Sequence, residues 1–325
     1  MTTTQHPLGD GPMQLGAHIG QQNMTASEMR DLWKRLDAGG VDWISIWDHL
    51  YEAPPQGGTV PHFEALSTLG TLVADTRNAR ISCLVFYVGY RNAGLLAKAA
   101  TTLDHFSGGR FTLGLGSGWH ETEAAAFGYD FPSLGERFDM LEESFELIRS
   151  LLTQERTSYD GRWVRAEDAS CLPAPVQERL PIWLGGIGER RTIPMAARLA
   201  DGWNAAYITP ERFAHLSALL DSHATAAGRD PAEIERTINV MFHLVTDPAE
   251  VEPERERGRA PWGDLADRFD EGALVGTPEM AVERILEYRS AGAQGLNVAL
   301  RAPILHDALD AYLEEVIPTV QRETA

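Results

Sequence analysis

The segment IWLGGIGERRTIPMAARLADGWN, residues 182–204, is the part of this chain that says most about its fold. Its pattern predicts a short buried strand, a glycine-rich turn at 185–188, a helix over about 189–200 and a strand that begins at Trp203. Glycines after a strand let backbone N–H groups come close to an anion, and the following helix points its positive end at the same place. The segment therefore predicts a strand–helix unit with a phosphate-binding turn, which indicates a phosphate-bearing ligand.

The same alternation of strand and helix continues through nearly the whole chain. Strands are predicted at 13–19, 41–47, 80–87, 110–115, 181–184, 203–206, 237–245 and 295–300. Helices are predicted at 27–38, 62–75, 93–106, 134–152, 189–200, 210–227, 277–291 and 305–316. Largely apolar strands joined by helices predict a parallel sheet covered by helices. Eight such units close most economically into an α/β fold of the (β/α)8 TIM barrel type, with a doubly wound open sheet as the alternative.

The predicted strands and helices fall in one domain over residues 13–325, preceded by a flexible polar arm at 1–12. Two segments are expected as insertions in the loops of the barrel. The first, about 154–180, contains a polar stretch at 158–168 that is typical of a short hairpin. The second, about 247–275, is charged and contains proline, which favours an inserted or mobile loop.

The composition argues against several classes of partner. A net charge of −19 makes nucleic acid or an anionic membrane surface an unsuitable partner, because both require a basic surface. It does not exclude a phosphorylated small molecule, which needs only local donors. The two cysteines, Cys83 and Cys171, do not form a disulfide framework and fit a reducing compartment. With no apolar run of membrane-spanning length and no secretory leader pattern, the chain is expected to be cytoplasmic.

In a TIM barrel the active site lies at the carboxyl ends of the strands, and the pair Asp48-His49 follows the second predicted strand. A histidine in this position can donate or accept a proton near neutral pH, and an adjacent acid can hold a ring N–H of a ligand. The alternative is a histidine that only caps a loop. Position alone leaves both interpretations open.

The fourth predicted strand ends in GLGSG, residues 114–118, and is followed by HETE, residues 120–123. The first pattern lacks the G-x-G-x-x-G spacing of a dinucleotide site, so it predicts either a tight strand end beside a flat ligand or a plain turn. The second lacks the H-E-x-x-H spacing of a zinc site, so no metal is expected and a solvated helix start is favoured. Trp47 and Trp119 could form walls around a ring-shaped ligand.

Several of these motifs occur together and in order. They are Trp-Asp-His at 47–49, LLAKAATTLDHFSGGRFTLGLGSGWHETEAAAFG at 95–128, GERFDMLEESFELIRSLL at 135–152, the segment 182–204, and VGTPEMAVERILEYRSAGAQGLNVAL at 275–300. From about Met13 to its end the chain resembles the bacterial luciferase-like flavin or deazaflavin oxidoreductases. The resemblance implies a TIM barrel, usually a homodimer, that binds a flavin-type cofactor at the carboxyl ends of its strands. Helix 138–152 could form the dimer contact, or it could pack on its own barrel.

Within this family the chain is most similar to the branch that uses coenzyme F420, a deazaflavin hydride carrier. That branch often has Asp-His where Asp48-His49 stands, whereas FMN-dependent relatives more often have Glu-His. The resemblance implies a non-proline cis peptide behind the cofactor ring at Leu84-Val85. It also assigns groups of residues to roles. His49 is the proton donor or acceptor, and the cofactor ring is positioned by Asp48, Leu84, Val85, Gly116, Ser117 and Gly118. The cofactor phosphate is held by Gly185, Gly186, Ile187, Gly188 and Arg190, and the substrate side is formed by His18, Gln21, Tyr87, Trp119 and His120.

One position departs from the family pattern. The sugar-phosphate dehydrogenases of this branch carry a catalytic glutamate where this chain has Trp119, and the nearest acids are Glu121 and Glu123. The departure argues against sugar-phosphate oxidation. The leading hypothesis is an F420-dependent oxidoreductase that transfers a hydride to or from a small molecule with an activated C=C, C=O or C=N bond or an alcohol. The alternatives are an FMN-dependent monooxygenase that uses reduced flavin and oxygen, and a non-catalytic protein that binds a deazaflavin or flavin.

Overall fold

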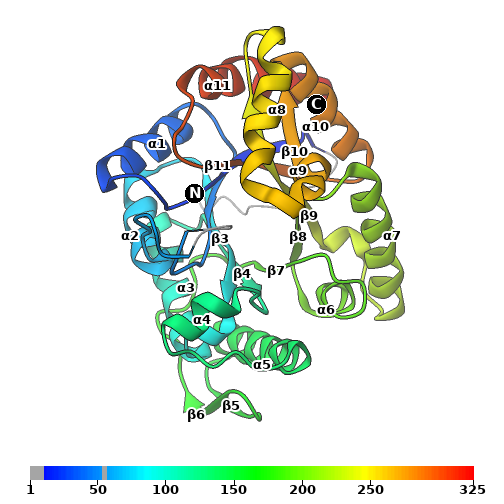
Figure 1. The fold of residues 1–325 in the computed structure, drawn as a ribbon. Coiled ribbons are helices and arrows are strands. Elements are labelled where there is room, and N and C mark those ends of the chain that lie inside the picture. Colours follow the sequence, from blue (N-terminus) through cyan, green and yellow to red (C-terminus); the bar gives the residue numbers. More distant parts are fainter. Residues whose placement is uncertain (1–10, 53–56) are drawn as a thin grey trace.

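The computed structural model describes residues 11–52 and 57–325, and its centre is a closed ring of parallel strands (Figure 1). The strands of the ring are β1 (Gln14–Ile19), β2 (Trp43–Ile46), β3 (Arg80–Tyr87), β4 (Phe111–Gly116), β7 (Ile182–Gly185), β8 (Gly202–Ala206), β9 (Glu235–Leu244) and β11 (Gly295–Leu300). They pair in the order β9, β11, β1, β2, β3, β4, β7 and β8, and β8 pairs with β9 to close the ring. The predicted TIM barrel is therefore confirmed. The predicted arm at 1–12 lies outside the described residues except for its last two positions.

Helices follow the strands and surround the ring (Figure 1). They are α1 (Ala26–Ala38), α2 (Ala65–Asp75), α3 (Ala93–Ser107), α4 (Glu121–Ala126), α5 (Leu134–Thr153), α6 (Thr192–Leu199), α7 (Pro210–Ala226), α8 (Val251–Arg259), α9 (Ala266–Gly272), α10 (Pro278–Ser290), α11 (His306–Ala311) and α12 (Ile317–Thr324). The hairpin expected within 154–180 is present as the antiparallel pair β5 (Thr157–Asp160) and β6 (Arg165–Ala169).

Local sequence signals set the ends of these helices. Thr25 caps α1 through a capping box, in which its side chain accepts from the N–H of Glu28 while Glu28 reaches back to the N–H of Thr25. Ser133 caps α5 in the same way. Gly108 ends α3 with a φ of 70°, a left-handed conformation that glycine adopts without strain.

The charged segment 247–275 was expected to be an inserted or mobile loop, but it contains helices, so the prediction of a loop is wrong. The segment contains α8, α9 and the short strand β10 (Ala273–Gly276), which adds to the ring parallel to β9. Ion pairs between residues three apart, including Glu254 with Arg257, stabilise α8, and Val251 is buried. Tertiary contact and charge pairing thus produce helices in a segment whose composition is typical of loops.

A small apolar cluster, separate from the main core, consists of Trp43, Leu84 and Trp183, with Val85 packed against it. Trp43 and Trp183 meet edge to face with ring centroids 5.2 Å apart. A Cβ at Gly16 would lie 1.6 Å from Trp43, and one at Gly202 would lie 2.4 Å from Trp183. Glycine at these two strand positions therefore makes the space that the indoles fill.

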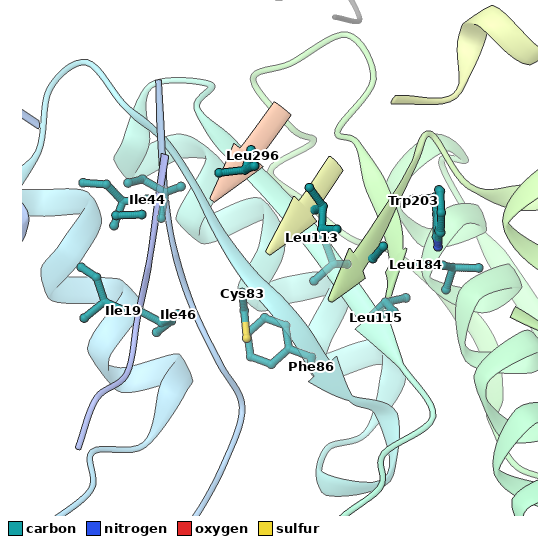
Figure 2. Packing of buried hydrophobic residues seen from close by; sticks show 14 of the residues in the cluster. Ile19, Ile44, Ile46, Cys83, Phe86, Leu113, Leu115, Leu184, Trp203 and Leu296 are labelled. Atoms are coloured by element: carbon teal, nitrogen blue, oxygen red, sulfur yellow. The ribbon is translucent and has the colours of Figure 1, made fainter. Parts of the chain in front are cut away.

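The apolar strand side chains that point outward form the main core with the helices. Figure 2 shows part of this packing, with side chains from neighbouring strands gathered in one layer. They include Ile44, Cys83, Leu113, Leu184 and Trp203. The apolar side of α5 belongs to the same core, because Leu141, Phe145, Ile148 and Leu151 are buried in it. This helix face packs on its own barrel and is not available as a dimer contact.

Candidate active site

The carboxyl ends of the barrel strands bring together most of the predicted site residues. His18 lies near the end of β1, Asp48 and His49 follow β2, Tyr87 ends β3, and Gly116 ends β4. Residues far apart in the sequence thus share one rim, as the parallel strands of a barrel require.

His49 is held by a carboxylate from the loop after β4. Its ring nitrogen Nδ1 lies 3.2 Å from each carboxylate oxygen of Glu123, in the first turn of α4. The side chain of Glu123 is 1% exposed and that of His49 is 14% exposed. The expected solvated helix start is therefore wrong at this position. From the sequence, Glu123 was noted only as one of the acids nearest to the family's catalytic-glutamate position at Trp119, and no role was predicted for it.

Glu123 gathers donors from the loops after β2 and β3. Its Oε2 accepts from the backbone N–H groups of Leu50 and Tyr51 at 2.8 and 2.9 Å, and its Oε1 accepts from the Tyr90 hydroxyl at 2.5 Å. Burial acts to raise the pKa of Glu123, but the hydrogen bonds and the neighbouring His49 lower it to about 2. An ionised carboxylate only accepts hydrogen bonds, so we assign the ring proton of neutral His49 to Nδ1. The Nε2 atom is left to exchange a proton.

Asp48 is fixed behind the same rim. Its Oδ2 accepts from the N–H of Tyr87 at 3.0 Å and from the guanidinium of Arg91 at 2.7 Å, and Arg91 also binds Glu64. Burial raises the pKa of Asp48, while the charge of Arg91 acts in the opposite direction. Its Oδ1 is buried and has no hydrogen-bond partner in the described part of the chain. A buried acceptor without a donor is costly, so this oxygen is suited to an N–H group of a ligand.

His18 lies inside the rim in a chain of buried polar groups. Its Nδ1 is 2.7 Å from the Ser45 hydroxyl oxygen, which in turn accepts from the amide of Asn297 at 3.0 Å. Burial, followed by the nearby charges of Arg301 and His49, lowers the pKa of His18 to about 3. The ring is therefore neutral over the physiological pH range.

Gln21 is part of the framework of the site. Its amide donates to the carbonyl of Trp47 at 2.9 Å and to that of Phe63 at 3.3 Å, and its oxygen accepts from the N–H of Trp47 at 3.1 Å. The side chain is fully buried. These contacts connect two loops, so we place Gln21 behind the site and not on its substrate side, where the sequence placed it.

Aromatic rings surround His49. Trp119, which is 57% exposed, stacks on His120 at 4.8 Å and meets His49 edge to face at 5.2 Å. Trp47 lies 6.5 Å from His49, and its indole N–H donates to His62 Nε2 at 3.0 Å. Trp47 and Trp119, which the sequence predicts as walls around a ring-shaped ligand, thus both contact His49 edge to face.

The bond between Leu84 and Val85 is a cis peptide, at the position that the resemblance implies. The pairing of β3 with β4 shifts register around this bond. A Cβ at Gly116 would lie 2.4 Å from Val85, and one at Gly185 would lie 2.7 Å from it. Glycine at the ends of β4 and β7 thus makes room for the bulged residue inside the barrel mouth.

The end of β4 also encloses Tyr87. Gly118 has a φ of 71°, and a Cβ there would lie 2.5 Å from the Tyr87 ring. Arg137 holds this turn by donating to the carbonyl of Ser117 at 3.1 Å. The Tyr87 hydroxyl is buried without a hydrogen-bond partner among the described residues, and burial raises its pKa.

The glycine-rich turn after β7 differs in detail from the prediction. Helix α6 begins at Thr192, three residues later than expected, because the carbonyl of Gly188 accepts from the N–H of Ile193 and residues 189–191 form a turn. The N–H of Gly186 donates to the carbonyl of Asn204 at 3.0 Å and is not free for an anion.

Two backbone donors of this turn are available. In the described part of the chain no acceptor is present for the N–H of Ile187 or of Gly188. Arg190 is exposed and makes no ion pair with any described side chain, whereas Arg191 binds Asp139 at 2.6 Å. Of the residues predicted to hold the anion, Ile187, Gly188 and Arg190 thus keep available donors within the described part of the chain, whereas Gly186 does not.

The described residues contain no group of histidine, cysteine or acidic side chains arranged to hold a metal ion. Among the described helices, none combines the length and the apolar composition needed to cross a membrane.

Comparison with known proteins places this geometry in a family. The family described as luciferase-like monooxygenase matches residues 11–266. A protein of Microbacterium testaceum named F420-dependent glucose-6-phosphate dehydrogenase is 28% identical, over 97% of this chain and 99% of its own length. A protein of the same name from Nakamurella multipartita is 30% identical, over 82% of this chain and 77% of its own.

A solved structure has the same fold along nearly the whole chain. An F420-dependent secondary alcohol dehydrogenase in complex with an F420-acetone adduct superimposes with a TM-score of 0.84 at 19% identity, covering 95% of this chain and 99% of that one. The barrel, the strand-end site and the match over most of the sequence lead to one conclusion. The chain belongs to the luciferase-like monooxygenase family.

Proposed function

We propose that this protein is an F420-dependent oxidoreductase. The observation that carries the proposal is the match, over most of the chain, to relatives named as F420-dependent dehydrogenases. The pair Asp48-His49 supports the deazaflavin branch over the FMN branch, because the family resemblance associates Asp-His with F420 and Glu-His with FMN.

The residues at the barrel mouth fit such a cofactor. The unpartnered Oδ1 of Asp48 can accept from a ring N–H, and the bulge at Val85 offers a surface behind a flat ring. The N–H groups of Ile187 and Gly188, with Arg190, can hold the phosphate. Glu189 is the nearest acid in the turn, and its charge is offset by its ion pairs with α7.

When bound, a deazaflavin supplies hydride transfer to or from carbon, and the protein supplies orientation and a proton. His49 is the residue we assign to the proton. Glu123 fixes its ring orientation and keeps its Nδ1 protonated, so Nε2 accepts a proton from an alcohol, or the protonated ring donates one to a developing alkoxide. The rings of Trp47 and Trp119 limit the access of water to His49.

The substrate we propose is a small molecule with a polarised C=C, C=O or C=N bond, or the corresponding alcohol. The sugar-phosphate dehydrogenases that the chain resembles use a glutamate at the position of Trp119. Here an exposed indole stacks on His120, and the nearest buried acid, Glu123, is fully occupied by His49, Tyr90 and the backbone. This arrangement favours a less polar substrate than a sugar phosphate. A homodimer remains a prediction of the family resemblance.

Titration of the purified protein with F420 and with FMN, followed by cofactor fluorescence, tests the cofactor. We expect F420 to bind tightly and FMN weakly. A preference for FMN, with oxygen uptake by the reduced complex, would instead support a monooxygenase. Failure to bind either cofactor would contradict the proposal.

Two variants test the assigned roles. Gly188→Ala brings a Cβ within 3.0 Å of the Thr192 hydroxyl, and we expect F420 affinity to fall about tenfold, or about 1.4 kcal/mol. Gly135→Ala, which meets nothing within 4 Å, is the matched control and should leave the affinity unchanged. His49→Ala should lower turnover far more than F420 affinity, and an equal loss of both would exclude His49 as the proton-transfer residue.

A further inference from the structure

A cavity of about 390 Å³ opens between the ends of β9 and β11 and the helical segment 251–262. Most of its lining is apolar and comes from Met241, Phe242, Trp262, Leu300, Pro303 and Ile304. The charged groups in its wall are Glu254, Arg257 and Arg301, and His243 lies beside them. None of these residues was singled out by the sequence, because they lie in a segment expected to be a loop or at strand ends without a motif.

Arg301 occupies an unusual position in this cavity. Its guanidinium lies 5.4 Å from the ring centroid of Trp47 and 5.8 Å from that of Trp262. Two cation–π contacts orient the group without neutralising its charge. Among the side chains that the structure describes, no carboxylate lies within ion-pair distance of Arg301.

The other charges in the cavity wall are balanced. Glu254 lies 2.7 Å from Nδ1 of His243 and 2.7 Å from Arg257, which also contacts Glu250. Burial lowers the pKa of His243, so its ring is neutral near pH 7. Among the side chains that the structure describes, the charge of Arg301 is therefore the one in this apolar cavity that no other charge balances.

The cavity adjoins the rim that carries His49. Trp47, which contacts Arg301, also meets both His18 and His49 edge to face. Ala299 in the cavity lining also pairs with His18 across β11 and β1. The cavity thus borders the strand ends next to the proposed proton-transfer site.

We propose that this cavity is the substrate pocket and that Arg301 binds the carboxylate of an otherwise apolar monocarboxylic acid. Contacts of the guanidinium with aromatic rings leave the N–H groups at its edge to bind a planar carboxylate through two parallel hydrogen bonds. A phosphate dianion requires more positive charge than one arginine supplies, and a neutral substrate would leave the arginine unpaired. The proposal rests on the proposed function, because it assigns the substrate of the same barrel mouth.

Calorimetric titration of the F420-loaded protein with sodium octanoate tests this assignment, with 1-octanol and octyl phosphate as chemical controls. We expect octanoate to bind at least tenfold more tightly than the other two. In Arg301→Gln the octanoate affinity should fall at least tenfold while that of 1-octanol stays the same. Arg301→Lys should retain part of the affinity, because it keeps the charge and loses the planar pair of donors. Arg259→Gln, a substitution in the same segment at a residue that pairs with Asp270, is the control and should change nothing.

The outcomes separate the two proposals. An octanoate affinity within twofold of wild type in Arg301→Gln, or equal binding of octanoate and 1-octanol, would overturn the assignment of Arg301. Tighter binding of octyl phosphate would overturn the monocarboxylate class. In each case F420 titration of the same variants reports on the cofactor independently, so normal F420 binding leaves the proposed function standing. If the protein does not bind F420, the octanoate titration is made on the unloaded protein; the expected pattern there leaves the pocket standing while the cofactor proposal fails.

Discussion

The substitution Glu123→Gln tests how the active site is built. The carboxylate of Glu123 accepts from the N–H groups of Leu50 and Tyr51, from the Tyr90 hydroxyl and from Nδ1 of His49. A glutamine has only one acceptor oxygen. If that oxygen stays with the two backbone N–H groups, the new NH2 group faces Tyr90 and His49. The tyrosine hydroxyl can rotate to accept, and His49 can accept only by moving its proton from Nδ1 to Nε2.

The effect on stability follows from the pKa of Glu123. A shift from 4.5 to about 2 corresponds to about 3 kcal/mol of folding free energy when the group is ionised. Because the folded-state pKa is the lower one, this contribution is present above about pH 5 and is lost as the pH falls toward 2. We therefore expect Glu123→Gln to lower the free energy of unfolding by up to about 3 kcal/mol at pH 7 and by about 1.4 kcal/mol at pH 3.

The effect on chemistry follows from the tautomer of His49. In the variant Nε2 would carry the proton and could no longer accept one from an alcohol. Loss of a correctly oriented general base lowers kcat by about 10²- to 10⁴-fold. The affinity for F420 should stay within a few-fold of wild type, because Glu123 is not among the residues that we assign to the cofactor.

Three measurements on the same samples check these expectations. Urea unfolding at pH 7 and pH 3 gives the stability difference, long-range ¹H–¹⁵N NMR gives the tautomer of His49, and steady-state kinetics with an accepted substrate gives kcat. Glu121→Gln is the matched control, since Glu121 is exposed in the same turn of α4. The reasoning would be refuted if His49 were protonated on Nε2 in the wild-type protein, or if the two variants had the same stability at pH 7.

Two further sets of predictions concern packing and pH. The substitution Gly116→Ala places a Cβ 2.4 Å from Val85 and should reduce the free energy of unfolding by about 1–3 kcal/mol, measured by urea unfolding. The substitution Gly70→Ala lies in the middle of α2 with open space around it, and it should raise the free energy of unfolding by about 0.5–1 kcal/mol. Equal effects of the two substitutions would contradict the packing argument. Burial lowers the pKa of His18 to about 3 and that of His62 to about 4, so both bind a proton only on unfolding between pH 6 and 4. The free energy of unfolding should therefore fall by about 1.4 kcal/mol for each unit of decreasing pH and for each ring. The substitution His62→Gln should remove the contribution of one ring. A free energy of unfolding that does not change between pH 6 and 5 would disprove the burial of these rings as neutral species.

The parts of the fold that were predictable are those specified by local sequence. The strands at 80–87 and 295–300 have the predicted bounds because each is a mostly apolar run next to turn residues. The order of strands and helices was enough to predict a barrel, and the barrel predicts which strand ends meet. The positions of Asp48 and His49 on one rim therefore followed from the sequence alone.

The remainder depends on contacts between distant segments. Whether Glu123 at a helix start is solvated or buried is decided by the loops at 50–51 and 90, which fold over it from other strands. The helices of 247–275 have a loop-like composition and are held by ion pairs and by the barrel edge. The cis peptide at Leu84-Val85 was predicted only through the family resemblance, because no local property of leucine or valine indicates it.

The walls of the cavity come from two different parts of the chain, and this affects how related proteins can diverge. Arg301 and Trp47 belong to the barrel, whereas Trp262, Glu254 and Arg257 belong to a segment inserted between β9 and β10. Exchange of that segment alters one wall of the cavity and leaves His49, Glu123 and Asp48 in place. Substrate specificity can therefore evolve by replacement of this one inserted segment, while the residues that transfer the proton stay unchanged.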